Sequence, residues 1–134
     1  MSNFRFLCAA AAIFGLSAPA LAAEQVEFVL PSGNIGCIYT PKGGVPTYQP
    51  VGGGPELSCD RVEPKYVRII LGPSGNAVLH KNVGDASCCS ANLTLNYGGI
   101  WKAGPFVCKA STKGLDCRRG THGFFMSRAR LEAY

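Results

Sequence analysis

The feature that most constrains the fold is an alternation of apolar and polar residues with a period of two. Val26, Phe28 and Leu30 share one face of the stretch 25–30, and the stretches 65–71 and 92–97 alternate in the same way. Clusters of glycine, proline, serine and asparagine separate these stretches and are typical of tight turns. Short strands with turns at this density predict an all-β fold, a small antiparallel β-sandwich or barrel. The one helical candidate is the short segment S-R-A-R-L-E-A at 127–133.

The tetrapeptide P-S-G-N occurs twice, at 31–34 and at 73–76. Proline fixes φ, serine can bond back to the chain, and glycine followed by asparagine tolerates positive φ, so each copy favours a hairpin turn. A phosphate-binding P-loop would need G-x-x-x-x-G-K-S/T before a helix, and no such residues follow either copy. We therefore interpret both copies as turns.

The first 22 residues have the pattern of a secretory signal peptide. Arg5 precedes an apolar run from Phe6 to Leu16, and Ala20-Leu21-Ala22 then forms an A-x-A cleavage site. Cleavage after Ala22 removes Cys8 and leaves a single β-rich domain of residues 23–134, which we expect in the periplasm or secreted. No other segment has the roughly 20 consecutive apolar residues that a transmembrane helix needs.

Six cysteines remain in residues 23–134, and an even number in a small exported chain favours disulfides over free thiols or metal ligands. They are Cys37, Cys59, Cys88, Cys89, Cys108 and Cys117. The segments 28–37 and 106–117 both read Phe-Val, then a turn with serine and glycine, then a cysteine, as expected for two hairpins. Cys108 and Cys117 stand on opposite arms of the second hairpin, which predicts a disulfide between them. The other four allow three pairings, one of which is a vicinal Cys88–Cys89 bridge with Cys37–Cys59.

The adjacent cysteines also allow a functional interpretation, in which Cys88 and Cys89 with His80 carry out redox chemistry or bind a soft metal. The chain lacks C-x-x-C and a second ligand pair at a recognisable spacing, so we expect no metal and no cofactor. It also lacks G-x-S-x-G, and its carboxylates show no pair typical of a glycosidase. These absences favour a protein that is not an enzyme.

Residues 41–58 are the least strand-like part of the chain, because nine of these 18 positions are glycine or proline. Such a composition predicts a long surface loop, which in a small domain is either functional or merely mobile. Tyr48 lies at its centre and is a candidate aromatic contact for a ligand.

Positive charge concentrates near the C-terminus. Without Arg5 the chain has 12 basic and 8 acidic residues, a net charge of +4, and residues 101–134 hold 7 basic against 2 acidic. The stretch R-R-G-T-H-G-F-F-M-S-R gathers basic side chains around a glycine turn and predicts a corner that binds an anion or a glycan. Its candidate residues are Arg118, Arg119, His122 and Arg128, with Tyr48 and Trp101 as further contacts. The alternative is that the arginines are solvated and the histidine is hydrogen-bonded within its turn.

Four motifs spread over the domain resemble a family of small exported bacterial proteins of unknown function. They are S-G-N-I-G-C at 32–37, L-N-Y-G-G-I-W at 95–101, F-V-C with G-L-D-C within 106–117, and H-G-F-F-M-S-R at 122–128. Asn96 replaces a proline of the family pattern and Thr121 a glycine, and the doubled Cys88-Cys89 departs from the family's cysteine spacing. The resemblance implies a β-rich, disulfide-linked fold in the cell envelope or outside the cell, and it implies no activity.

These features favour a non-catalytic binding or interaction module of the envelope or the medium. Its expected partner is an anionic polymer or a protein, and we expect no nucleic-acid partner. The alternative is an inhibitor of a secreted hydrolase such as lysozyme, although a basic inhibitor would be repelled by a basic lysozyme. Thiol or metal chemistry at Cys88 and Cys89 is a third, minor hypothesis.

Overall fold

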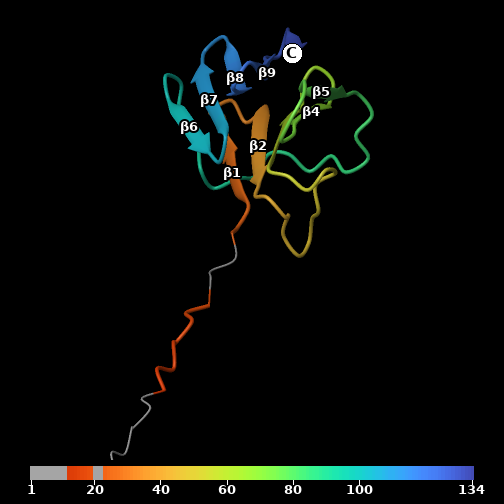
Figure 1. Ribbon diagram of the computed structural model, residues 1–134. Helices are drawn as coiled ribbons and strands as arrows, with labels where there is room; N and C mark the ends of the chain where they lie inside the picture. Colours follow the sequence, from red (N-terminus) through yellow and green to blue (C-terminus); the bar gives the residue numbers. More distant parts are fainter. Residues whose placement is uncertain (1–11, 20–22) are drawn as a thin grey trace, which may run out of the picture.

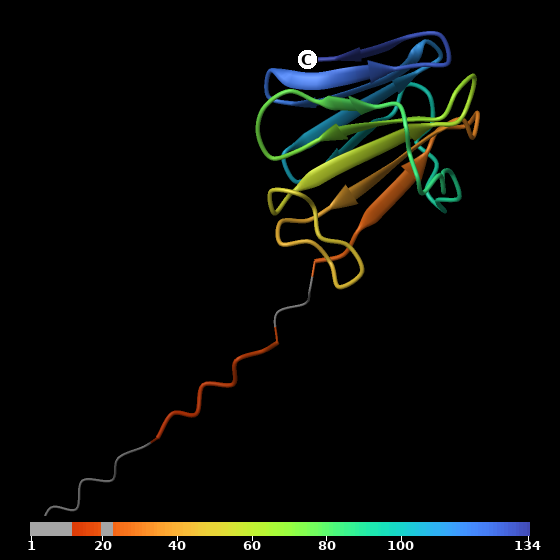
Figure 2. The same ribbon diagram turned by 90° about the vertical axis from the view of Figure 1, so that its right-hand side faces the viewer.

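The computed structural model describes residues 12–19 and 23–134. Within them, ten strands form two antiparallel five-stranded sheets, which pack as a sandwich (Figures 1 and 2). The predicted all-β, antiparallel, disulfide-linked fold is therefore confirmed. Residues 12–19 are exposed and have no regular secondary structure, while most of the expected signal peptide, including its cleavage site, lies outside the described residues. The described residues contain no helix long and apolar enough to cross a membrane.

Each sheet is an up-and-down meander built from one part of the chain. The first sheet has the order β1-β2-β3-β4-β5, with β1 (Val26–Val29), β2 (Ile35–Thr40), β3 (Glu56–Arg61), β4 (Val67–Leu71) and β5 (Val78–His80). The second has the order β10-β9-β8-β7-β6, with β6 (Ile100–Ala103), β7 (Phe106–Ser111), β8 (Gly114–Arg119), β9 (His122–Met126) and β10 (Leu131–Ala133). In Figure 2 the blue strands of the second sheet lie above the orange to green strands of the first.

The inward side chains of the two sheets form one core with a repeated pattern. In each sheet an aromatic residue lies opposite the first cysteine of a cross-strand pair, and an apolar residue lies opposite the second. The two rows are Phe28, Cys37, Cys59, Ile69 and Trp101, Cys108, Cys117, Phe124. The rings of Phe28 and Trp101 meet across the sandwich with centroids 4.8 Å apart. In this register β1 and β2 of the first sheet correspond to β6 and β7 of the second. The similar sequences at 28–37 and 106–117 would instead match β1 and β2 with β7 and β8, one strand further along.

The two core disulfides each join neighbouring strands of one sheet. Cys108–Cys117 joins β7 to β8, as predicted, and Cys37–Cys59 joins β2 to β3. Of the pairings left open by the sequence, the structure has the one with a vicinal Cys88–Cys89 bridge. The sulfurs of Cys37, Cys59 and Cys117 lie within 4.8 Å of one another. Each is committed to a disulfide, so none offers the thiolate that a metal ion would bind.

Both P-S-G-N copies are hairpin turns, the first between β1 and β2 and the second between β4 and β5. Their glycines, Gly33 and Gly75, have φ of 70° and 76°, the left-handed conformation that favours glycine. Asn34 of the first copy exchanges two hydrogen bonds with Glu63: Nδ2 donates to the backbone oxygen (3.0 Å), and Oδ1 accepts from the backbone amide (2.7 Å). The first turn is thereby tied to the β3–β4 connection.

Two sequence predictions of regular structure are wrong. Residues 92–97 are not a strand, because they make only one parallel bridge beside β1: the amide of Val29 donates to Leu93, and that of Leu95 donates to Val29, both at 2.9 Å. This segment carries the chain from one sheet to the other and buries only Leu95 of the expected apolar face. Residues 127–133 form a turn and β10 rather than a helix, because pairing with β9 satisfies their backbone and packs Leu131 against the core.

The glycine- and proline-rich loop is shorter than expected. It runs from 41 to 55, and the last three residues of the predicted loop belong to β3. Leu57 is fully buried and its neighbours pair with β2, which explains the difference.

Candidate functional site

The first sheet has a recess on its outer face. Strand alternation sends Leu57, Cys59 and Ile69 into the core and turns the side chains between them outward. One outward row runs Ile38, Ser58, Ile70, and the next runs Gly36, Asp60, Arg68. The connection 81–99 between the two sheets contacts this face and partly covers it.

Arg68 is the centre of a polar network on this face. Its Nε and Nη2 donate to the two carboxylate oxygens of Asp60 at 2.7 and 2.8 Å, and its Nη1 donates to Asp85 at 2.8 Å. The hydroxyl of Tyr66 donates to Asp60 and accepts from the backbone amide of Cys88, at 3.0 Å for the second bond. The hydrogen bond to Asp60 raises the pKa of Arg68, and burial raises the pKa of Tyr66. With Arg68 charged and Tyr66 neutral, the network holds residues 85–88 against the sheet.

The vicinal disulfide rests directly on β2. A Cβ atom at Gly36 would lie 2.9 Å from the sulfur of Cys88 and 3.0 Å from that of Cys89. Only glycine leaves room for the disulfide at this distance from the sheet. The two half-buried sulfurs form a polarizable, weakly polar wall above the strands.

We call the two adjoining cavities on this face the outer recess. One has a volume of about 270 Å³ and lies by the disulfide, between Glu27, Gly36 and Asp60. The other has a volume of about 180 Å³ and lies by the 41–55 loop, between Thr40, Tyr48, Glu56 and Asp85. The two share the walls formed by Ile38, Ser58, Arg68 and Ser87. Of the described residues, four carboxylates and one guanidinium line the outer recess, and together these groups have a negative formal charge.

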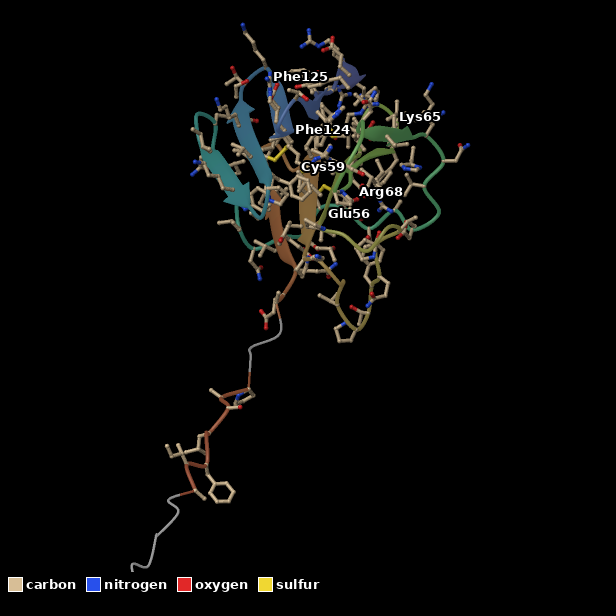
Figure 3. The ribbon with its side chains drawn as sticks, viewed as in Figure 1. Glu56, Cys59, Lys65, Arg68, Phe124 and Phe125 are labelled. Atoms are coloured by element: carbon tan, nitrogen blue, oxygen red, sulfur yellow. A yellow bond between two sulfur atoms is a disulfide. The ribbon has the colours of Figure 1, made fainter. Side chains whose placement is uncertain are left out.

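Glu56 is the least solvated of these carboxylates. It is 4% exposed, and its Oε1 accepts a hydrogen bond of 2.8 Å from the hydroxyl of Tyr48. Burial, with this hydrogen bond, raises the pKa of Tyr48 to about 12. Arg68 lines the same cavity, and the two side chains lie on the same side of the sheet (Figure 3), but no described basic residue forms an ion pair with Glu56. A buried carboxylate without a countercharge is costly in a folded protein.

The predicted basic corner is divided among three places. Arg118 and Arg119 are consecutive in β8 and point to opposite faces, Arg118 outward, where it lies 3.0 Å from Asp116. The guanidinium of Arg119 donates to the backbone oxygens of Gly72 and Gly75 in the β4–β5 connection. It therefore links the two sheets.

The other two predicted basic residues lie at opposite ends of β9. His122 begins the strand and is opposite Arg119 in the register, whereas Arg128 lies beyond its far end. Six extended residues span about 20 Å, too far for one small anion. The backbone oxygen of Arg128 accepts from Arg61, a buried arginine whose pKa is lowered by its burial.

The two predicted aromatic contacts also separate. Trp101 is 8% exposed and packs against Phe28 and Tyr39, so it belongs to the core. Tyr48 lies in the 41–55 loop and lines the outer recess, a position from which a loop residue can contact a ligand.

The outer face of the second sheet carries a group of basic side chains. Lys102, Lys109 and Arg118 point outward from the adjacent strands β6, β7 and β8, and Val107 lies between Lys102 and Arg118 in the register. Lys113 and Arg130 border the same face, Arg130 over the ring of Phe125 at 4.2 Å. We call these five basic residues the basic face. The second-sheet segment, residues 100–134, has seven basic and two acidic residues, against five and six in residues 23–99.

Sequence reasoning did not find the residues of the outer recess other than Tyr48 and the two cysteines. Arg68 lies in the predicted strand 65–71, and Asp60 lies in the neighbouring strand β3. The two residues are directly opposite each other, so knowledge of the β3–β4 register would have paired them. Glu56 and Asp85 carry no such signal, because one was assigned to the loop and the other lies far along the chain.

No family model matches the chain, and neither the curated proteins nor the solved structures contain a match. The family resemblance of the four motifs therefore remains a prediction.

Proposed function

We propose that the protein is a non-catalytic binding module of the envelope or the medium, and that its basic face binds an anionic polymer. The observation that carries this proposal is the segregation of charge: residues 100–134 have seven basic and two acidic residues, and five of the basic ones make up the basic face. Such a field attracts polyanions from solution and orients the molecule as it approaches them.

The form of the basic face suits a repeating polymer better than a single small anion. The sheet is exposed at Lys102, Lys109 and Arg118, and neighbouring strands lie about 4.8 Å apart, so the charges are spread along a surface. Lysine ammonium groups on flexible stems act as point charges, without the fixed fork of an arginine. Asp116 already pairs with Arg118, which leaves the lysines as the main free charges.

The test measures binding of the exported protein to poly(glycerol phosphate) at increasing salt. We expect binding to weaken between about 0.1 M and about 1 M salt, because the Debye length falls from about 10 to about 3 Å. The variant Lys102→Gln, Lys109→Gln, Arg118→Gln should bind roughly tenfold more weakly, as three exposed contacts of about 0.5 kcal/mol each predict.

The matched control is Lys42→Gln, Lys65→Gln, Lys81→Gln, which removes the same charge from exposed positions within residues 23–99. It should change the affinity by less than about threefold. Equal losses in the two variants would make the attraction a matter of net charge, and no binding at low salt would remove the proposal.

The inhibitor hypothesis ranks second. The basic face has the wrong sign for a basic lysozyme, so an inhibitor would have to use the opposite, acidic side of the molecule. Complete inhibition of a lysozyme at equimolar protein would reverse this order.

A further inference from the structure

The outer recess contains a negative charge that the protein itself does not neutralise. Glu56 is 4% exposed, and Oε1 accepts from Tyr48 at 2.8 Å. Among the described residues, Oε2 takes part in no hydrogen bond or ion pair, and Glu56 lines the 180 Å³ cavity. Although the Glu56 side chain is largely buried, Oε2 itself is accessible, and a carboxylate oxygen open to a cavity is a ready acceptor for a charged donor from outside.

Among the described residues, the one basic side chain that lines this cavity is already engaged. Arg68 uses Nε and Nη2 on Asp60 and Nη1 on Asp85, and it forms no hydrogen bond to Glu56. Asp85 accepts through Oδ1 only, within the described residues, and its side chain is 78% exposed at the mouth of the cavity. Glu56 and Asp85 therefore offer two carboxylates to a cation, of which only Asp85 has a partial countercharge.

The walls restrict the kind of cation. The floor between the two carboxylates consists of Ile38 and Ile70, with the hydroxyl of Ser58 between them in the register. An ammonium group has three donors that carboxylate and hydroxyl oxygens can accept, and an alkyl chain or a sugar ring can cover the isoleucines. The adjoining 270 Å³ cavity, with its disulfide wall, gives the body of such a ligand room beyond the ammonium.

We propose that the outer recess binds a small primary amine, with Glu56 and Asp85 receiving its ammonium group. The site lies on the first sheet and is independent of the basic face and of the polymer proposed for it. Two kinds of molecule carry this group with a body of suitable size, an alkyl diamine and an amino sugar.

The experiment is calorimetric titration of the exported, disulfide-bonded protein with cadaverine and with glucosamine. N-acetylglucosamine is the neutral counterpart of the amino sugar, and CaCl₂ tests a bare metal ion. We expect saturable binding of at least one amine and no binding of N-acetylglucosamine. Saturation by cadaverine alone assigns the site to alkyl amines, and saturation by glucosamine assigns it to amino sugars.

Two variants test the residues. Glu56→Gln keeps the shape and the acceptor for Tyr48 and should weaken amine binding about tenfold or more, as expected for loss of a charge-assisted hydrogen bond. Asp85→Asn changes an exposed side chain, so it keeps the test valid if Glu56→Gln does not fold. It should weaken binding at least about threefold. Glu132→Gln removes an exposed carboxylate from the second sheet and should leave binding unchanged.

Four results would overturn the proposal. They are no saturable heat with either amine, equal binding of glucosamine and its N-acetyl form, unchanged amine binding in both Glu56→Gln and Asp85→Asn, and saturation by Ca²⁺ alone. Because none of these involves the basic face, the polymer proposal stands or falls separately.

Discussion

Arg118 and Arg119 illustrate how position along a strand decides what a side chain does. They are neighbours with the same chemistry, but β8 turns one outward and the other toward the second P-S-G-N turn. Arg119 supplies a charged donor to two backbone oxygens of the β4–β5 connection, so it acts in the fold rather than at a binding surface.

We expect Arg119→Ala to lower the free energy of unfolding by about 1–3 kcal/mol, because the Gly72 and Gly75 oxygens lose a charged donor. Arg118→Ala should change it by less than about 0.5 kcal/mol, since the pair with Asp116 is exposed. Urea denaturation with the disulfides intact measures both values. Similar losses for the two variants would show that Arg119 does not link the sheets.

At the scale of elements, the connection 81–99 is the part that makes the outer recess. It has almost no regular structure of its own and is held by the Arg68–Asp85 pair, the Tyr66–Cys88 hydrogen bond and the contact of the disulfide with Gly36. Arg68 and Gly36 lie in paired strands, and Tyr66 directly precedes β4. A rigid sheet thus positions an irregular segment, the usual arrangement of binding sites on loops.

Gly36→Ala should lower the free energy of unfolding by about 1–3 kcal/mol, because the added methyl group overlaps both sulfurs of the vicinal disulfide. Amide hydrogen exchange at Cys88 should become faster as the connection lifts from Tyr66. Gly72→Ala is the matched control, since its Cβ meets open space. If the exchange rate at Cys88 is the same in both variants, Gly36 does not seat the connection.

At the scale of the molecule, the two meanders share one core, although each forms its hydrogen bonds separately. Phe28 of the first sheet packs on Trp101 of the second, and a disulfide lies on each side of the same interface. Neither apolar face is covered without the other sheet, so we expect the sheets to unfold together.

Trp101 is the single tryptophan and reports on the second sheet. Its fluorescence and the far-ultraviolet circular dichroism should give coincident denaturation curves. Phe28→Ala should lower the stability by about 3–5 kcal/mol in both signals, even though Phe28 belongs to the first sheet. Separate transitions, or a loss seen by circular dichroism alone, would show that the sheets are independent units.

The parts of the fold that the sequence predicts are those with local causes. The stretches 25–30 and 65–71 became β1 and β4, and the P-S-G-N turns and the Cys108–Cys117 hairpin formed as expected, because alternation, turn chemistry and a short cysteine spacing act within about ten residues. Residues 92–97 alternate equally well but have no full strand partner, and 127–133 became β10 because β9 had a free edge. Partner availability is a tertiary property and leaves no mark on the segment itself.

The features of the candidate sites also divide into those with local causes and those with tertiary causes. By itself the sequence determined that basic residues gather near the C-terminus and that two cysteines are adjacent, since both facts are written in neighbouring letters. Tertiary structure alone decided that Arg118 and Arg119 face opposite ways, that Trp101 is buried, and that Glu56, Asp85 and Arg68 line one cavity. The physical reason is that an isolated strand sets only the alternation of its side chains, whereas the packing of sheets and connections sets which face is buried, which is open, and which charge is left without a partner.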